Sequence, residues 1–382
     1  MARRFLRPSR SDRLMAGDSM QQPYQSIESL LSEGRSRPLS VAVVIPCYKV
    51  KRHILAVLDG LMAYADAIYV VDDCCPERVG DFVRQQRTDP KIHVLIHDAN
   101  QGVGGATITG YRAGMAAGFD VIVKFDGDGQ MDPSHIPYLL APFRSHSADY
   151  VKGNRFFNLE DISKMPPLRV IGNAGMSFLT KLSSGYWDIF DPANGFTAIH
   201  ARILERLPLD KIDKRYFFES DMLFRLGTLR ARVFDAPMAA LYGDETSGLS
   251  IARVTWPFWR KSLVNFAKRI FYNYFLRNFS IGSTYLLSAT VLTIIGVVLG
   301  VGYWTDSAAH HRAATSGQVM LAALPLIFGA QMLLSFLSFD IESTPKLALH
   351  PMLMPSPGVH VEAGHSTGSR DAHSLADLEP SP

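Results

Sequence analysis

The chain has 382 residues, a net charge of +3 and 47% hydrophobic residues. It is long enough for more than one domain and apolar enough for a sizeable core. The near balance of charge gives no reason to expect nucleic-acid binding. Its three cysteines, Cys47, Cys74 and Cys75, form neither a disulfide framework nor a zinc-ligand spacing. Reduced thiols in a cytosolic domain are therefore expected.

Residues 1–39 are polar and rich in Arg, Ser, Pro and Gln, which predicts a disordered basic tail. Arginines crowd its first part without an apolar run behind them, so it does not have the pattern of a secretory signal. A solvated tail and a tail that meets an anionic membrane surface both fit this composition.

Residues 40–250 predict an α/β domain with a mostly parallel, Rossmann-like sheet. Apolar strand-like runs alternate with helix-like segments, which indicates βαβ units. Loops after the strand ends would then form a ligand crevice. The strands are expected at 41–46, 67–73, 92–97, 121–126 and 149–151, and the helices at 52–64, 77–87, 104–117 and 133–145.

Residues 251–280 mix Trp, Phe and Tyr with Lys and Arg at helical spacing. This pattern predicts amphipathic helices that lie in the headgroup layer of a membrane. The alternative is a core helix with a solvated basic face.

Residues 281–339 predict a transmembrane hairpin. The stretches 281–304 and 317–339 carry no charge, and as helices each is about 35 Å long, enough to cross a bilayer. Cations before the first span greatly outnumber Arg312 in the loop, so the positive-inside rule places the large domain in the cytoplasm. Residues 340–382 are expected to form a flexible tail.

Asp126 and Asp128 follow an apolar run and are two residues apart. Alternate residues of a strand share a face, so both carboxylates can point the same way and hold a hard divalent cation together with substrate phosphates. A solvated turn is the alternative. Asp72 and Asp73 end an earlier strand and can accept hydrogen bonds from a nucleobase or a ribose.

A glycine-containing segment, 100–106, begins a helix after the third predicted strand. It is not a dinucleotide fingerprint, because Thr107 stands where a third glycine is required and the segment does not follow the first strand. NAD binding is therefore excluded. Small residues at a helix N-terminus still suit the close approach of a ligand.

Four segments together resemble the family 2 glycosyltransferases with the GT-A fold. The closest likeness within them is to polyprenyl-phosphate glycosyltransferases of the dolichol-phosphate mannose synthase type, and the trailing hairpin fits their bacterial members. The similarity runs from Val41 to about Ser250, and Asn100-x-Gly102 ahead of Asp126-x-Asp128-x-Gln130 is more specific than Asp-x-Asp alone. The four segments are 44–48, 70–73, 100–106 and 126–130.

The resemblance implies the donor-side roles. A nucleotide sugar would contact Pro46, Tyr48, Asp73, Asn100, Gly102, Gly105 and Asp126. Mg²⁺ or Mn²⁺ would be held by Asp128, Gln130 and Asp126, and it would neutralise charge on the leaving nucleoside diphosphate. Asp132 is either a helix cap or a site residue.

The resemblance also implies catalytic candidates on the acceptor side: Glu219, Asp221 and Arg155. Arg155 would meet an acceptor phosphate or form a structural ion pair. The spacing to Arg225 favours Glu219 over Asp221 as the counterpart of the family's acidic residue, and both stay candidates. A phosphate acceptor is mostly ionised at neutral pH and needs no strong base, whereas a hydroxyl acceptor does.

The expected function is that of an inverting, metal-dependent transferase in the cell (cytoplasmic) membrane, multi-pass, with its catalytic domain on the cytoplasmic face. It would move a hexose from a UDP- or GDP-linked sugar to polyprenyl phosphate. The alternatives are a polysaccharide or glycolipid acceptor and a non-catalytic nucleotide-binding scaffold. A homo-oligomer is left open. The chain departs from the family at Lys49, at 74–76 and at 242–248, where an arginine is missing.

Overall fold

The computed structural model describes residues 38–156, 167–192, 194–238 and 251–353. Its described part contains a seven-stranded sheet of order β3-β2-β1-β4-β6-β5-β7. The first four strands in the chain run parallel, as predicted. The strands are β1 (Val41–Cys47), β2 (Ala67–Asp72), β3 (Ile92–Ile96), β4 (Val121–Lys124), β5 (Tyr150–Asn154), β6 (Thr197–His200) and β7 (Val233–Pro237).

β6 and β7 were not among the expected strands. β6 lies antiparallel between β4 and β5, and β7 pairs with β5 in parallel. The sheet is therefore mixed, because the antiparallel strand β6 separates the parallel strands β1 to β4 from β5 and β7. Thr197 of β6 lies between Lys124 of β4 and Lys152 of β5 in the same row.

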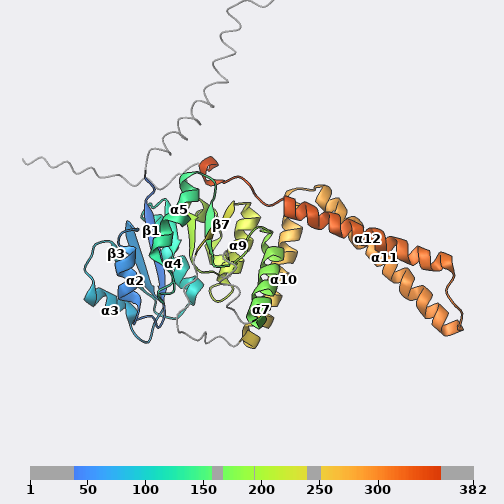
Figure 1. The fold of residues 1–382 in the computed structure, drawn as a ribbon, viewed down its shortest axis with the longest axis horizontal. Helices are drawn as coiled ribbons and strands as arrows, with labels where there is room; N and C mark the ends of the chain where they lie inside the picture. Colours follow the sequence, from blue (N-terminus) through green and yellow to red (C-terminus); the bar gives the residue numbers. More distant parts are fainter. Residues whose placement is uncertain (1–37, 157–166, 193, 239–250, 354–382) are drawn as a thin grey trace, which may run out of the picture.

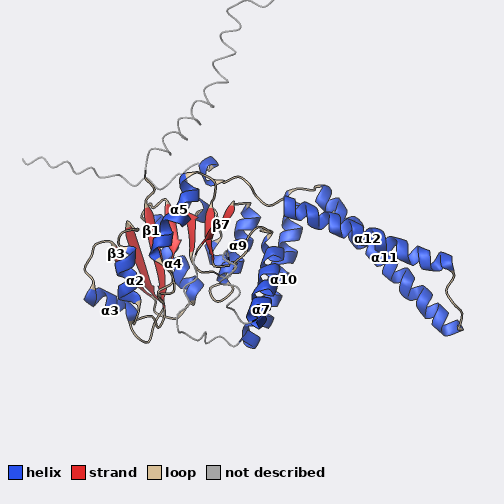
Figure 2. Ribbon diagram, viewed as in Figure 1, coloured by secondary structure: helices blue, strands red, loops and turns tan. Residues whose placement is uncertain are grey.

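Helices cover both faces of the sheet (Figures 1 and 2). Alternate residues of β1 point to opposite faces, and Val43 belongs to one buried cluster while Val44 belongs to the other. The cluster of Val43 includes residues of α2, α3 and α5, and that of Val44 includes residues of α4, α8 and α9. Their bounds are α2 (Ile54–Leu61), α3 (Val79–Gln86), α4 (Val103–Ala116), α5 (Ile136–Arg144), α8 (Ala201–Leu204) and α9 (Phe218–Leu229).

Helix α10 (Ile251–Phe271) leads from the domain to the hairpin through a π-helical turn, Tyr272–Arg277. It packs beside α7 (Pro167–Ser184) and α9. Phe258 and Asn265 on its inner side are buried, whereas Trp256 and Trp259 on its outer side are 75% and 46% exposed. One helix thus combines a packed inner face with an outward aromatic face, and its place in the headgroup layer stays a prediction.

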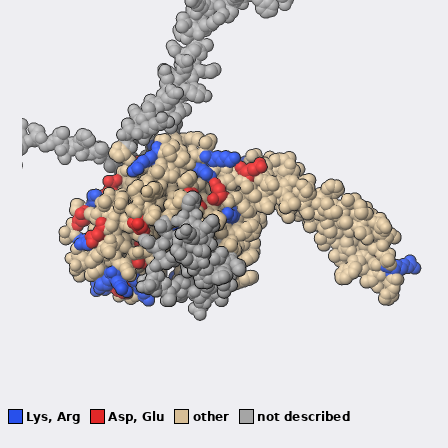
Figure 3. Space-filling view, in the orientation of Figure 1, with Lys and Arg blue, Asp and Glu red and all other residues tan. Residues whose placement is uncertain are grey.

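Two long apolar helices, α11 (Ile281–His310) and α12 (Ser316–Glu342), form an antiparallel pair that projects from the domain (Figure 1). Both are long and apolar enough to cross a membrane. Figure 3 shows almost no charged side chain along the pair except at its tip. Gly296 lies against Leu326, and Gly329 lies against Thr293, so small residues let the two backbones approach.

The expectation of a flexible tail from residue 340 is wrong for residues 340–353. Helix α12 continues to Glu342, and Asp340 is buried. Beyond it the chain returns to the domain, where the backbone N–H groups of Leu349 and His350 donate to the Asp149 carboxylate. Buried hydrogen bonds to a carboxylate are among the stronger ones. Residues 354–382, and residues 1–37 of the N-terminal tail, lie outside the described part.

Candidate active site

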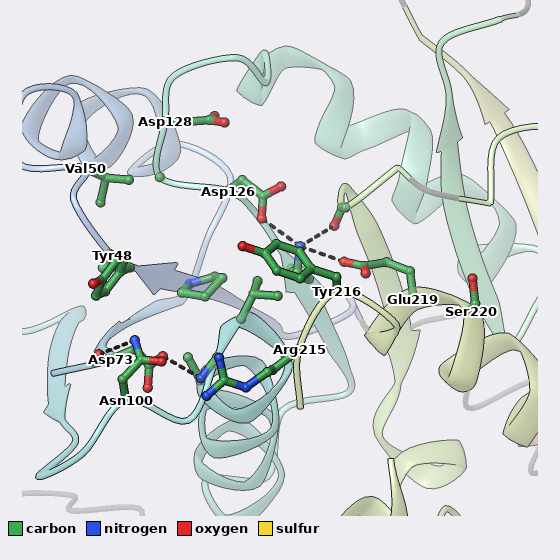
Figure 4. Close-up of a pocket in the computed structure, with 18 of the residues that line it drawn as sticks. Tyr48, Val50, Asp73, Asn100, Asp126, Asp128, Arg215, Tyr216, Glu219 and Ser220 are labelled. Atoms are coloured by element: carbon green, nitrogen blue, oxygen red, sulfur yellow. Dashed lines mark hydrogen bonds and ion pairs between the residues drawn. The ribbon is translucent and has the colours of Figure 1, made fainter. Parts of the chain in front are cut away.

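A cleft of about 760 Å³ opens where β1, β2 and β4 end, the place where open α/β sheets bind ligands. The glycine segment before α4, the loop before α9 and α9 itself line it (Figure 4). Residues of α7 and α10 also line it. It brings together eight of the predicted site residues: Pro46, Tyr48, Asp73, Asn100, Gly102, Asp126, Asp128 and Glu219.

Asp73 shapes the donor side through its backbone partners. Its buried carboxylate accepts hydrogen bonds from the N–H groups of Gln101 (2.8 Å) and Gly102 (2.7 Å), and His97 Nδ1 lies 2.8 Å away. Asn100 Nδ2 donates to the Asp73 carbonyl at 3.1 Å. The carboxylate therefore fixes the segment that begins α4, in addition to lining the cleft.

Glycine is required at position 102. Its φ is +89°, in the region that disfavours side chains, and a Cβ atom there would lie 2.4 Å from the carbonyl oxygen of Lys214. Gly105 is in the first turn of α4 and is not among the residues that line the cleft. A Cβ there would lie 2.5 Å from the Cβ of Gln101. Its role is close packing at the start of the helix.

Lys124, the last residue of β4, is a site residue that the sequence interpretation missed. Its Nζ lies 2.6 Å from Asp126 Oδ1, 3.2 Å from the Gly195 carbonyl oxygen and 3.5 Å from Glu219 Oε1. Figure 4 shows Asp126 and Glu219 pointing toward one another from opposite walls. The available signal was a lysine inside an apolar strand, because a buried ammonium requires partners.

The charge state of Lys124 follows from these partners. Burial by itself disfavours the ammonium, but the carboxylates of Asp126 and Glu219 outweigh it and raise the pKa of Lys124 above its ordinary value. Lys124 therefore stays charged at neutral pH and bridges the carboxylates of Asp126 and Glu219. Gly195 completes the contact, since a Cβ there would lie 2.4 Å from Asp126 Oδ2.

A second buried lysine, Lys152, lies two strands away in the same row. Its ammonium donates to the carbonyl of Asn194. Burial lowers the pKa of Lys152 to about 8, although Glu219 and Asp191 act against this shift. The two lysines together hold the loop that contains Asn194 and Gly195 against the sheet.

Asp126 and Asp128 are the described carboxylates that suit a divalent cation. Asp128 accepts a hydrogen bond from the backbone N–H of Gln130 at 3.0 Å. Gln130 is not among the residues that line the cleft, and its place as a metal ligand stays a prediction. Asp132 caps the next turn by accepting from Ser134 N at 2.8 Å.

The residues at this position fit a metal that is shared with a substrate. Within the described ranges, no group of three or more His, Cys, Asp or Glu side chains is placed to hold a metal ion on its own. Mg²⁺ commonly takes one or two carboxylates and completes its shell with substrate phosphates and water. Asp126 and Asp128 at the mouth of a cleft are such a donor set.

The acceptor-side candidates separate in the structure. Glu219 lines the cleft, whereas the buried Asp221 carboxylate points to Asn265 Nδ2 (2.8 Å) and to the backbone N–H of Asp213 (2.9 Å). Arg155 does not line the cleft, and its Nε donates to the buried Asp191 at 2.8 Å. Of the three candidates, Glu219 lines the cleft together with Asp126 and Asp128, whereas Asp221 and Arg155 do not.

This sheet, with its reversed strand between β4 and β5, defines a GT-A type domain. The chain belongs to glycosyl transferase family 2, whose sequence model matches residues 42–207.

Three characterised relatives are similar to part of the chain. Undecaprenyl-phosphate mannosyltransferase of Micrococcus luteus is 34% identical over 173 residues, 45% of this chain and 70% of the relative. UDP-N-acetylglucosamine–dolichyl-phosphate N-acetylglucosaminyltransferase of Methanococcus voltae is 29% identical over 218 residues, 53% of this chain and 86% of the relative. Polyprenol monophosphomannose synthase of Mycolicibacterium smegmatis is 28% identical over 189 residues, 48% of this chain and 70% of the relative.

Proposed function

We propose that this protein transfers a hexose from a UDP- or GDP-linked sugar to polyprenyl phosphate at the cytoplasmic face of a membrane. The names of the three relatives support a lipid-phosphate acceptor. The observation that carries the proposal is in the cleft: Phe258 of α10, the helix that leads to the hairpin, lines the same cleft as Glu219. An acceptor held in the bilayer would approach from this side.

The donor half would bind the nucleotide sugar between the turn after β1 and the start of α4. Pro46, Tyr48 and Asn100 line this end, and the N-terminus of α4 faces it. The N–H groups of a helix start favour negative charge. Asp126 and Asp128 would hold a bound Mg²⁺ or Mn²⁺, which would neutralise the charge that develops on the departing diphosphate.

The reaction would be a direct displacement. A phosphate oxygen of the acceptor attacks the anomeric carbon, the bond from that carbon to the diphosphate oxygen breaks, and its electron pair leaves with the nucleoside diphosphate. The acceptor phosphate is mostly ionised at pH 7, so no strong base is needed. Glu219, fixed by Lys124, would orient the site, and inversion is the outcome expected of an in-line attack.

The test is transfer of labelled sugar from a panel of nucleotide sugars into the lipid fraction. It uses the full chain in detergent with polyprenyl phosphate and Mg²⁺ or Mn²⁺, with EDTA as the control. We expect one donor to label lipid, and both EDTA and Asp128→Asn to abolish the label while the protein stays folded. Label in a polysaccharide or glycolipid would show that this molecule, and not polyprenyl phosphate, is the acceptor. Binding of the nucleotide sugar without any turnover would indicate a scaffold.

A further inference from the structure

The loop from Asp213 to Phe217 (the acceptor loop) lines the cleft next to Glu219 and also contacts the start of α4. Arg215 and Tyr216 line the cleft directly. The carbonyl of Lys214 accepts hydrogen bonds from the backbone N–H groups of Gly104 (3.0 Å) and Gly105 (3.2 Å), so the loop also touches the start of α4. Its position therefore determines the width of the cleft between the donor half and Glu219.

Asp221 and Lys261 contact this loop directly, and Asn265 holds it through Asp221. Asp221 Oδ2 accepts from the backbone N–H of Asp213 at 2.9 Å, and Asp221 Oδ1 accepts from Asn265 Nδ2 at 2.8 Å. Asp221 and Asn265 are only 5% and 6% exposed. Hydrogen bonds to a buried carboxylate are strong and are costly to lose. The Asp213 carboxylate is bound in turn by Lys261.

Both Lys261 and Asn265 belong to α10, and the inner face of α10 runs from the cleft to the hairpin. At the cleft end, Phe258 lines the wall and packs edge-to-face on Phe217, with ring centroids 5.1 Å apart. At the other end, Arg269 Nη1 lies 2.6 Å from the buried Asp340 carboxylate of α12. The positions 258, 265 and 269 follow the helical repeat, so one face makes all these contacts.

We propose that Asp221 and Asn265 are positioning residues through which α10 holds the acceptor loop in place. The Asp221 carboxylate serves as a hydrogen-bond acceptor for the loop and for α10, and it does not take a proton from the acceptor. The acceptor side of the active site is complete only when α10 is docked on α9. The kinetic part of this inference rests on the proposed function, whereas the loop-holding part rests on the contacts alone.

The chemistry of this pair allows an exchange test. In Asp221→Asn, the new amide oxygen still accepts from Asp213 N, and Asn265 can turn its own amide to accept from the new NH₂ group. In Asn265→Asp, two carboxylates face each other and the donor is lost. In the double exchange, the amide at position 221 accepts from Asp213 N and donates to the carboxylate at position 265, so both hydrogen bonds return. A catalytic carboxylate at position 221 would not be rescued in this way.

The first readout is limited trypsin digestion of the full chain in detergent, because Lys214 and Arg215 are exposed cleavage sites within the loop. We expect Asn265→Asp to speed cleavage there about tenfold, as expected for the loss of one charged hydrogen bond. The double exchange should return the rate to within about threefold of the original. Asn278→Asp, the same change at an exposed position beyond α10, is the matched control and should leave the rate unchanged.

The second readout is steady-state transfer. Asn265→Asp should raise the KM for the lipid acceptor about tenfold. Asp221→Asn and the double exchange should retain most of the kcat, whereas Glu219→Gln should not. An inactive Asp221→Asn with a normal digestion pattern would show that Asp221 is catalytic. An Asn265→Asp that digests and reacts normally would show that the hydrogen bond between Asn265 and Asp221 does not hold the loop.

The two proposals fail separately. If the original chain transfers no sugar to lipid, the proposed acceptor is wrong, and the digestion series still decides whether Asp221 and Asn265 hold the loop.

Discussion

His200 is a buried histidine that should make stability depend on pH. It ends β6 and caps α8, where its Nδ1 accepts from Arg202 N at 3.3 Å. Its ring stacks on that of His350 with centroids 4.2 Å apart. Burial, followed by the nearby His350 and Arg202, lowers the pKa of His200 to about 3, although Asp120 and Asp149 act against this shift. His200 is therefore neutral in the folded chain at pH 7.

The size of the effect follows from this pKa. Below the ordinary pKa of 6.5, the unfolded chain binds a proton that folded His200 rejects. The contribution is complete above about pH 6.5 and is lost as the pH falls toward the folded pKa. At pH 5 the loss amounts to about 2 kcal/mol in the free energy of unfolding. For a domain of this size that corresponds to a fall in Tm of about 4–8 °C.

The assay compares the Tm of the original chain with that of His200→Asn in detergent, at pH 7.5 and pH 5.0, by tryptophan fluorescence. Asn keeps a capping oxygen but has no proton to gain. Between the two pH values, we expect the Tm of the original chain to fall by about 4–8 °C more than that of the variant.

His311→Asn is the matched control, because His311 is exposed and has a φ of +48° that Asn tolerates. Between pH 7.5 and pH 5.0, the Tm of His311→Asn should fall by as much as that of the original chain. Equal losses in His200→Asn and in the original chain would refute the reasoning.

Two further predictions concern the site and the hairpin. Lys124→Met leaves Asp126 and Glu219 facing each other without a cation. We expect the free energy of unfolding to fall by about 3 kcal/mol and the kcat of label transfer to fall about 100-fold. Lys268→Met, at an exposed position of α10, is the control and should change neither quantity. Ala308→Cys, in a chain whose exposed Cys74 is serine, should react with an impermeant thiol reagent from outside intact cells, and labelling only in broken cells would reverse the predicted orientation.

The parallel half of the sheet could be predicted because its signals are local. Each strand there is an apolar run, and the carboxylates after β4 stand next to the strand that positions them. β6 has only four residues, too few to show a period of two, and its antiparallel pairing depends on partners far away in the chain. It therefore resembled a loop.

The missed parts of the site depend on contacts between distant segments. Lys124 is visible in the sequence, but Gly195, in a loop, and Glu219, in the first turn of α9, come near it only through the fold. Asp221 and Glu219 are two residues apart and stand in the same acidic segment, and only the helical turn separates their directions. The return of residues 344–353 to the domain could not be expected, because the segment has no periodic pattern of its own.

The return of the chain to Asp149 has a consequence for biogenesis. This carboxylate is fully buried, and His350, which follows it by 201 residues, supplies both a backbone and a ring hydrogen bond. At about 5–20 residues per second, a ribosome needs about 10–40 s to make that interval. During this time both apolar helices are synthesised. The α/β domain therefore acquires the hydrogen bonds from His350 only after the hairpin has been synthesised, so insertion of the hairpin into a membrane would begin before these hydrogen bonds form.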